Sequence, residues 1–518
     1  MINSLSKVSY RLLGMVFSFG LAAGCLADSG GAGTAYRPIS VDGFHDAIKH
    51  WNDRTGETGA AYYELDQIEA IADNLLLYQR DSGGWPSNQH PLRVASAGER
   101  ARALEQKSLA DASFDNRNIY PQIEYLSEVF RQTGKHRYRD GALKGLRYTL
   151  DRQYPNGGWA HSPDRTDLAY FRHITIADEV MPGVLTFLRK VAAGDYPFDY
   201  LDEKLRRQAA RAVVKGDALL LDLQVRIDGK RTGWAGQYHE EILQPAKGRA
   251  YELPGILAWE TVPVLEYLMS IPTPSKNVVE AVNGGAAWLE SASLSGFRID
   301  RVKAASQRFD FHNANYDLVV VDDAAAKPIW ARFYDLETSE PFLANRDGKR
   351  VSQLSEVDVE RRTGYSWYGY WPAKFLETEY PAWQQKTAVA ARLDSFHKAA
   401  SSADFDAYFD HFSRGGVFIG TDASERWSVE DFKRYVKPYF SQGKGWTYVP
   451  RDRTITVHGD VAWFDELLDN EAYGECRGSG VLVRDEGQWK IAQYNLHFPV
   501  PNDLAKQITE LIKQSGKR

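Results

Sequence analysis

The sequence predicts two modules of different class: a mostly α-helical first module, arranged as an α/α toroid-like barrel, and an α+β second module with a curved sheet. The first observation is a tryptophan turn that recurs, in Gln79-Arg-Asp-Ser-Gly-Gly-Trp85, Gln153-Tyr-Pro-Asn-Gly-Gly-Trp159 and the shorter Arg231-Thr-Gly-Trp234. The tryptophans are 74 and 75 residues apart. Repetition of one unit at a fixed period is typical of helical solenoids and toroids. The second observation is a change to alternating, strand-like sequence in the last quarter of the chain.

Helical apolar spacing precedes the first two turns. Ile68, Ile71, Ala72, Leu75 and Leu76 stand before Trp85. Equivalent positions, Leu143, Leu146 and Leu150, stand before Trp159. We therefore expect each helix to lead into an equivalent corner, with the corners gathered on one rim. At such a rim Trp85 either stacks on a sugar ring or packs as an aromatic corner without a ligand.

The first module is expected over residues 36–385 and the second over 387–518, with a boundary near 386. Strand-like segments at 318–321 and 330–334 show that the first module is not purely helical. The second module is predicted to contain helices at 389–412 and 430–440. Four strands are predicted at 454–458, 461–467, 480–484 and 489–496.

Residues 1–27 read as a signal peptide, in which Lys7 and Arg11 precede an apolar run from Leu12 to Leu21. The run is too short to span a bilayer stably, so we expect export to the periplasm, to the outer membrane as a lipoprotein, or to the medium. Cys25 lies in a segment that resembles a lipoprotein box, although ordinary signal peptidase would also suit it. Removal or lipidation of Cys25 leaves Cys476 alone, without a disulfide partner.

Composition bounds the function. A net charge of -6 gives no basic surface for nucleic acid, and that class is excluded. Aromatic residues make up 13% of the chain, which fits carbohydrate binding.

Several charged residues fall near the predicted corners. Asp115 and Asp178 come from separate loops, as the ligands of a hard cation such as calcium do, but either could equally cap a helix. His173 is either a base or a hydrogen-bonded core residue. Arg249 is either a functional cation or a buried partner for Glu252 or Asp178.

Eight ordered segments carry a family resemblance. They are Ser82-Gly-Gly-Trp-Pro-Ser-Asn88, Asp115-Asn116, Tyr154-Pro-Asn-Gly-Gly-Trp159, Arg172-His-Ile-Thr175 with Asp178, Thr232-Gly-Trp234, Gly248-Arg-Ala-Tyr-Glu-Leu-Pro254, Ala331-Arg-Phe-Tyr334 and Arg361-Arg-Thr-Gly-Tyr365. From about residue 62 to 385, the chain resembles the pectate lyases of polysaccharide lyase family 10.

This resemblance implies calcium-assisted β-elimination on polygalacturonate in an α/α toroid-like fold. The C5 hydrogen of galacturonate is weakly acidic, and a cation on the adjacent carboxylate stabilises the enolate-like transition state. By position, Asp115 and Asp178 would be the calcium ligands, and Arg249 would be the base. The implied substrate-binding residues are Trp85, Asn116, Arg172, His173, Lys247 and Arg332.

Four positions depart from the usual pattern of this family: Arg117, Ala160, Ala177 and His239. Arg117 and Ile119 are expected to crowd or recharge the cleft. Ala177 removes an amide that would support the calcium ligands.

Residues from about 388 to 515 carry a second resemblance. Phe418-Ile-Gly-Thr-Asp422, Gly459-Asp-Val-Ala-Trp-Phe464, Gly478-Ser-Gly-Val-Leu482, Trp489-Lys-Ile-Ala-Gln-Tyr-Asn-Leu496 and Pro499-Val-Pro-Asn502 resemble the SnoaL-like branch of the nuclear transport factor 2 superfamily. The resemblance implies a cone formed by a curved sheet and helices, and allows a homodimer through this module. A polar pocket is expected from Glu425, Asp465, Glu466, Tyr494 and His497, for dimerisation or a small ligand rather than for a second enzyme.

Three readings of function follow from the sequence. The first is an exported calcium-dependent pectate lyase that binds polygalacturonate or its oligomers. The second is a catalytically impaired protein that binds oligogalacturonides. The third is an inverting glycoside hydrolase that uses Asp115 and Glu260 as its two carboxylates.

Overall fold

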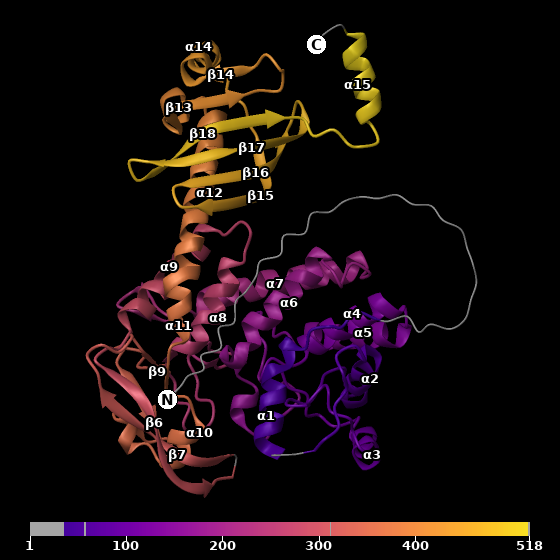
Figure 1. Ribbon diagram of the computed structural model, residues 1–518, viewed down its shortest axis with the longest axis vertical. Helices are drawn as coiled ribbons and strands as arrows, with labels where there is room; N and C mark the ends of the chain where they lie inside the picture. The colour runs from indigo at the N-terminus through magenta and orange to yellow at the C-terminus, as the bar shows by residue number, and fades with distance from the viewer. Residues whose placement is uncertain (1–35, 56–58, 311, 516–518) are drawn as a thin grey trace, which may run out of the picture.

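The computed structural model describes residues 36–55, 59–310 and 312–515 (Figure 1). The predicted signal peptide and Cys25 lie outside these residues. Within this part of the chain, no helix combines the length and apolar character needed to cross a bilayer.

The first module is built mainly from helices that pack in two rows. In one row α2 packs on α4, α4 on α6, α6 on α8, and α8 on α11; the second row contains α5, α7 and α9. This order places successive helix pairs side by side, as a helical repeat requires. The helices are α1 (His45–Thr55), α2 (Ile68–Tyr78), α3 (Ala97–Glu105), α4 (Tyr120–Thr133), α5 (His136–Asp151), α6 (Val180–Ala193), α7 (Glu203–Leu223), α8 (Ala258–Met269), α9 (Lys276–Ser291), α10 (Val359–Gly364) and α11 (Trp371–Lys374).

The tryptophan corners are structurally equivalent. Trp85, Trp159 and Trp234 are buried, and each indole N–H donates to a carbonyl near the end of the preceding helix, at Leu75, Thr149 and Leu220, with each distance 2.8 Å. A ring buried on all sides cannot present a face to a sugar. The predicted substrate-binding role of Trp85 is therefore wrong, and the packed-corner reading holds.

A glutamine at the end of each of these helices closes the corner. The Gln79 side-chain amide donates to the carbonyls of Gly83 and Gly141, both at 2.9 Å. Gln153 bonds Gly157 and Ala212 in the same way, and Gln224 bonds Thr232 and Ala281. Each glutamine side chain therefore links its own corner to a helix of the second row, which is α5, α7 or α9.

Short strands and one long hairpin complete the first module. Its four-stranded sheet has the order β11-β10-β9-β5, and β6 pairs with β7 as an antiparallel hairpin. Two-stranded pairs join β1 to β4, β2 to β3 and β8 to β12. The strands are β1 (Ile174–Thr175), β2 (Arg226–Ile227), β3 (Lys230–Arg231), β4 (Gln237–Tyr238), β5 (Ile256–Leu257), β6 (Phe297–Arg308), β7 (Asn313–Asp322), β8 (Trp330–Ala331), β9 (Phe333–Tyr334), β10 (Pro341–Ala344), β11 (Arg350–Val351) and β12 (Tyr368–Gly369).

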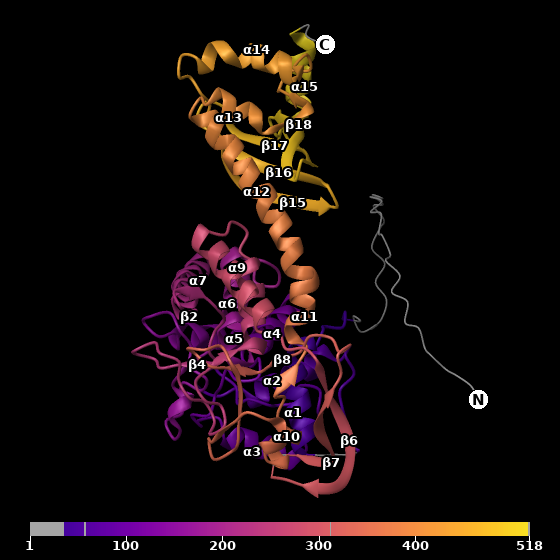
Figure 2. The ribbon, with the colours of Figure 1, turned by 90° about the vertical axis from the view of Figure 1, so that its left-hand side faces the viewer.

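The long helix α12 (Tyr380–Ser401) connects the first module to the second (Figures 1 and 2). The predicted boundary near residue 386 lies within this helix. The helix predicted at 389–412 is wrong in its second half: α12 ends at Ser401, the backbone reverses at Ala403 (φ 53°), and a separate α13 follows. The sheet has the order β14-β13-β18-β17-β16-β15 and includes all four predicted strands. Its elements are α13 (Phe405–Asp410), β13 (Phe412–Ile419), β14 (Arg426–Ser428), α14 (Val429–Phe440), β15 (Val449–His458), β16 (Val461–Asn470), β17 (Gly474–Asp485), β18 (Gln488–His497) and α15 (Ala505–Gln514).

The interior of the second module holds two of the residues expected to line a polar pocket. The Glu466 carboxylate is fully buried and bonds His397 and Arg453, each at 2.7 Å, with the Tyr494 hydroxyl at 3.3 Å. Asp465 lies on the opposite face of the sheet, because neighbouring residues of a strand alternate between faces. Glu425 accepts from the backbone N–H of Asp422, in the loop before β14. The five residues therefore do not line one pocket.

Gln79→Ala is expected to lower the free energy of unfolding by about 2 kcal/mol, because the carbonyls of Gly83 and Gly141 lose a buried donor. Urea denaturation followed by tryptophan fluorescence measures the change. The exposed Gln106, substituted by alanine, is the matched control. Equal midpoints for the two variants would show that the corner bonds add nothing to stability.

His90→Gln is expected to reduce the acid sensitivity of the fold. Burial and, to a lesser degree, Arg93 lower the pKa of His90 to about 4. Between its ordinary pKa of 6.5 and 4 the unfolded chain takes up a proton that the folded chain does not, so stability falls as the pH drops through this window. The urea midpoint should therefore fall less between pH 7 and pH 5 in the variant, whereas His136→Gln, on an exposed helix end, should behave like the parent.

Candidate active site

Two loops with strained backbones face each other in the first module. Asn116, Arg117 and Ile119 have φ values of 58°, 52° and 80°, and Asp178 and Glu179 have φ values of 53° and 56°. Positive φ is uncommon for residues with a Cβ, and for a β-branched isoleucine it is an outlier. Strain of this kind is found where the surrounding structure holds a functional site in place.

The first loop follows the Trp85 corner and precedes α4. The Asn118 side-chain amide donates to the carbonyls of Trp85 (2.8 Å) and Ser113 (2.7 Å), which fixes the loop to the corner. Asp115, 5% exposed, projects from this loop. Its Oδ1 lies 3.3 Å from His161 Nε2, and its Oδ2 lies 3.8 Å from Arg249 Nη2. Burial acts to raise the pKa of Asp115, but the charges of His161 and Arg249 outweigh burial and hold the pKa below its ordinary value.

The second loop carries Asp178 to the start of α6. Its backbone N–H donates to Glu260 Oε2 at 3.2 Å, and the other oxygen of Glu260 bonds Arg332 at 2.8 Å. Glu260 is therefore engaged in supporting the loop. Burial, followed by the negative charges of Asp115 and Glu260, raises the pKa of Asp178 well above its ordinary value. Two carboxylates thus share one region of low dielectric and repel each other.

Two arginines face these carboxylates. Arg249 Nη1 donates to Glu252 Oε1 at 2.9 Å, and the Arg249 backbone N–H donates to the other oxygen of Glu252. Arg249 thus pairs with Glu252, as one alternative predicted, but its side chain is 37% exposed and is not a buried partner. Glu252 first, and then Asp115, raises the pKa of Arg249 well above its ordinary value. Arg332 is 8% exposed and lies over the rings of Trp259 and Tyr365, 4.6 and 4.5 Å from their centroids.

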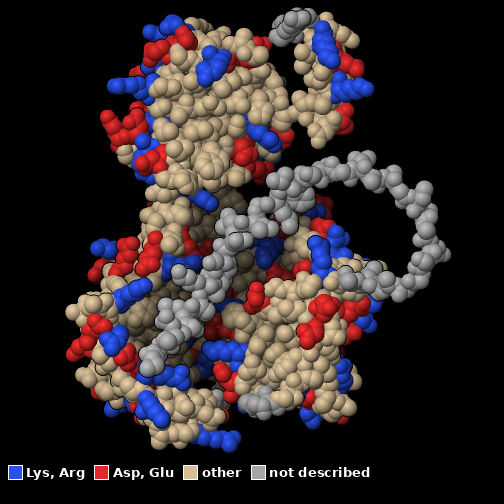
Figure 3. Space-filling view, viewed as in Figure 1, with Lys and Arg blue, Asp and Glu red and all other residues tan. Residues whose placement is uncertain are grey.

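Several of these side chains line one pocket. Asp178, Arg249 and Arg332 lie on its wall, and Tyr170, Gln237 and Tyr365 add hydrogen-bonding groups. The surface of the first module is hollowed between the helices and the β6–β7 side, and cationic and anionic side chains surround the hollow (Figure 3).

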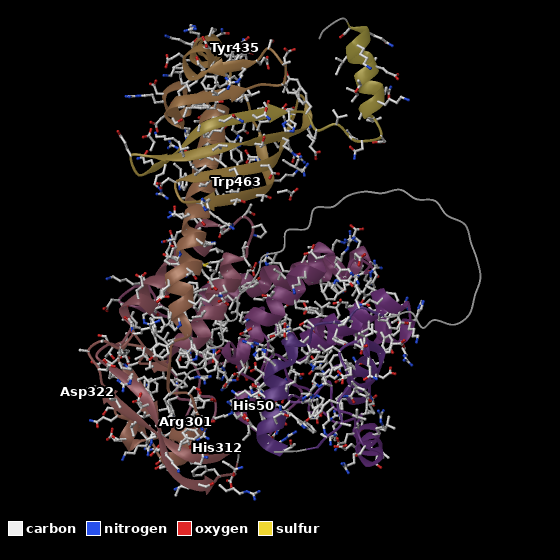
Figure 4. All side chains as sticks on the ribbon, in the orientation of Figure 1. His50, Arg301, His312, Asp322, Tyr435 and Trp463 are labelled. Atoms are coloured by element: carbon white, nitrogen blue, oxygen red, sulfur yellow. The ribbon has the colours of Figure 1, made fainter. Side chains whose placement is uncertain are left out.

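Helix α1 and the β6–β7 hairpin flank this region. Figure 4 places His50 on α1, with Arg301 and His312 across from it on the hairpin side. Burial lowers the pKa of His50, and the nearby Asp115 carboxylate acts against this shift. The Arg117 guanidinium bonds Glu179 and His45 and lies 3.4 Å from Asp46, so Arg117 ties α1 to the second strained loop.

The two aspartates fit a calcium ion by their donor chemistry. Asp115 Oδ1 is buried and accepts no hydrogen bond, and oxygen ligands from carboxylates are what calcium prefers. Among the residues that the structure describes, no group of three or more His, Cys, Asp or Glu side chains could hold a metal. A cation at these aspartates would thus need further oxygen ligands, from substrate or water.

The structure places the other predicted site residues as follows. Asn116 donates to Asn88 at 2.9 Å, next to Asp115. His173 bonds Glu240 at 2.9 Å, Arg172 lies 3.8 Å from the same carboxylate, and neither lines the pocket. Lys247 is exposed and also lies outside the pocket lining.

Sequence reasoning missed His161, which touches Asp115. Its only signal in the sequence is a position two residues after Trp159, at the end of the second corner. Two of the departures from the family pattern are alanines. Ala160 is fully buried, and Ala177 lies on the pocket wall.

Arg117→Ala is expected to loosen α1, because the helix loses its ionic link to Glu179. The link involves partly exposed groups and is worth about 1 kcal/mol, which corresponds to roughly fivefold faster amide exchange. Hydrogen exchange of α1 amides measures this. Arg131→Ala removes an ion pair with Asp199 elsewhere in the module and should leave α1 unchanged. Unaltered exchange in the Arg117 variant would show that apolar contacts alone hold α1.

Comparison with known proteins places this site in a family. A sequence model described as pectic acid lyase matches residues 79–376, and one described as a SnoaL-like domain matches residues 389–501. A search of curated proteins found no match.

Two solved structures of a family 10 polysaccharide lyase from Cellvibrio cellulosa are similar to the first module, each at 29% identity over 66% of this chain. One is an aspartate-to-alanine mutant in complex with trigalacturonic acid, with 98% of its chain covered and a TM-score of 0.52. The other has 97% of its chain covered and a TM-score of 0.50. With a mostly helical first module that resembles these lyases and a SnoaL-like second domain, the chain belongs to the pectic acid lyase family.

Proposed function

We propose that this protein is an exported pectate lyase that cleaves α-1,4-polygalacturonate by calcium-assisted β-elimination and leaves 4,5-unsaturated oligogalacturonides. The observation that carries the proposal is the convergence of Asp178, Arg249 and Arg332 on one pocket, with Asp115 Oδ2 3.8 Å from Arg249 Nη2. The trigalacturonic acid bound by the Cellvibrio cellulosa lyase mutant supports the substrate class.

Asp115 and Asp178 would hold calcium, directly or once substrate is bound. Calcium would neutralise the uronate carboxylate next to C5 and so make the C5 hydrogen more acidic. Arg332 would pair with a uronate carboxylate, because its position over two aromatic rings holds the planar guanidinium in one orientation. Asn116, Arg172, His173 and Lys247 remain proposed contacts for hydroxyls or carboxylates along the sugar chain.

Arg249 is proposed as the base that takes the C5 proton. Its side chain is 37% exposed and reaches the pocket from the turn that Glu252 closes. Without substrate, Glu252, Asp115 and Asp178 favour the protonated guanidinium. Neutralisation of the two aspartates by a cation would remove two of these three charges, which favours the base form. We expect activity to increase at alkaline pH for this reason.

Three further features from the sequence remain proposals. The first is export, either to the periplasm, to the outer membrane as a lipoprotein anchored at Cys25, or to the medium. The second is closure of the helical module into an α/α toroid, which the packing order from α2 to α11 supports. The third is a homodimer through the second module.

Arg249→Ala is expected to reduce the rate on polygalacturonate by about 100- to 10,000-fold, the usual contribution of a general base. The assay follows the ultraviolet absorbance of the new conjugated double bond, with and without a calcium chelator. Arg226→Ala, at an exposed position on β2, is the control and should keep full activity. Calorimetry should show that Asp178→Asn weakens calcium binding in the presence of trigalacturonate.

Other outcomes identify the alternative functions. Cleavage without absorbance, unaffected by the chelator, would support a hydrolase and contradict the lyase. Binding of oligogalacturonide with no turnover at any calcium concentration would support the impaired binding protein. An Arg249→Ala variant as active as the parent would remove Arg249 from the chemistry.

A further inference from the structure

A groove lies between the two modules, and the described residues that line it are all different from those that line the candidate active site. Its lining comes from α9, from α12, and from the adjoining ends of β17 and β18 with the turn between them. Figure 1 shows α9 beside the first turns of α12, where the Tyr380 hydroxyl donates to Asn283 Oδ1 at 2.9 Å. The groove has a volume of about 690 Å³, within the range of about 300 to 1,000 Å³ that is usual for ligand sites.

The lining of this inter-module groove combines cationic, aromatic and amide side chains. The described residues supply two guanidinium groups, two indole rings, four side-chain amides and no carboxylate. Guanidinium groups pair with carboxylates, amides exchange hydrogen bonds with hydroxyls, and an indole offers a flat apolar face to a sugar ring. The combination therefore fits a sugar chain that carries carboxylates. The guanidinium groups belong to Arg392 and Arg484, the rings to Trp383 and Trp489, and two of the amides to Gln385 and Gln488.

Two contacts orient Arg484 at the groove. Its guanidinium lies over the ring of Trp489, 4.7 Å from the centroid, and bonds the side chain of Gln385 on α12. The Asp460 carboxylate lies 3.2 Å from the same guanidinium but is exposed, and an exposed ion pair contributes little. Arg484 is therefore held in position and can still pair with a carboxylate of a ligand.

Two buried donors at the groove lack an acceptor among the residues that the structure describes. They are the indole N–H of Trp489, which is 5% exposed, and Nε of Arg392. Arg392 Nη2 donates to the Asp410 carbonyl at 2.5 Å, which fixes the guanidinium. A buried donor without a partner costs free energy. A ligand oxygen that enters the groove would supply an acceptor, which favours a ligand rich in oxygen atoms.

Trp383 adds a flat surface whose orientation is fixed. The half-buried indole stacks on Tyr380, with ring centroids 6.3 Å apart and planes 22° apart. Tyr380 stacks in turn on Phe375, at 5.8 Å and 18°. Because the ring is already held by this stack, it loses little conformational entropy when a sugar packs on it.

We propose that this groove is a second binding site for polygalacturonate, separate from the candidate active site. The proposal rests on the lyase function proposed above, because it takes the polymer of that reaction as the ligand. A protein held on a polymer at one site meets other segments of the same chain at a high effective concentration. The second module, which supplies Arg484 and Trp489, thus helps to keep the enzyme on its substrate.

Binding in the absence of turnover tests this site. Affinity electrophoresis in gels that contain polygalacturonate and a calcium chelator measures binding while the proposed calcium-dependent reaction is off. We expect the polymer to retard the parent protein, and the dissociation constant to rise at least fivefold in Trp383→Ala and in Arg484→Gln. Gln488→Ala, at an exposed position of the turn, should weaken binding without affecting the fold. Arg426→Gln removes a charge from an exposed position on β14 and should bind like the parent.

Two results would overturn the inference. One is binding as tight as that of the parent in all three groove variants. The other is equal retardation by polyglutamate, because the groove would then recognise charge and not a sugar.

Kinetics separate this site from the reaction. On polygalacturonate, the groove variants should show a KM at least threefold higher at unchanged kcat. On trigalacturonate, for which anchoring to a long chain gives no advantage, they should match the parent, and an equal rise in KM would count against a separate site. A parent protein without lyase activity that is still retarded through the groove would contradict the proposed reaction and support the binding site.

Discussion

Electrostatic repulsion between two acidic side chains is the constraint on which the site depends. Asp115, which is buried, and Asp178, which is half-buried, come from loops 63 residues apart in the chain, and the charge of Asp115 helps to raise the pKa of Asp178. Arg249 and Arg332 offset part of their charge, and Glu252 and Glu260 in turn fix the arginines. A site of alternating charges like this one is stable only if every member stays in place. His161 Nε2, 3.3 Å from Asp115 Oδ1, adds to the groups that face this carboxylate.

The helical scaffold holds these charges in place through its corners. At each corner the buried tryptophan bonds the preceding helix, and the glutamine bonds a helix of the second row. The loops that leave the corners are therefore held in position where they begin. Asn118 anchors the Asp115 loop to the Trp85 carbonyl. The strained φ values of both loops are therefore supported by hydrogen bonds at their base. The recurring tryptophan, buried at each corner, serves the site by fixing its geometry.

Arg117 illustrates how a departure from the family pattern is accommodated. A cation beside Asp115 would oppose the binding of the proposed calcium ion, yet Arg117 is turned toward Glu179 and α1. Its charge is offset by Glu179 and Asp46.

The second module is joined to the first by α12, a continuous helix, and keeps its own buried ionic network around Glu466.

The sequence alone determined the repeat, the two modules and four of the six strands in the second module's sheet, because periodicity is a local property. The resemblance of its ordered motifs to a known family marked Asp115, Asp178, Arg249 and Arg332 as candidates. Tertiary structure decided what those residues touch. Burial of Trp85, the pairing of Arg249 with Glu252, and the support of Asp178 by Glu260 depend on contacts between segments far apart in the chain. The break in the helix predicted at 389–412 likewise depends on how α12 and α13 pack on each other. His161 had no motif to mark it, since only the fold brings it to Asp115.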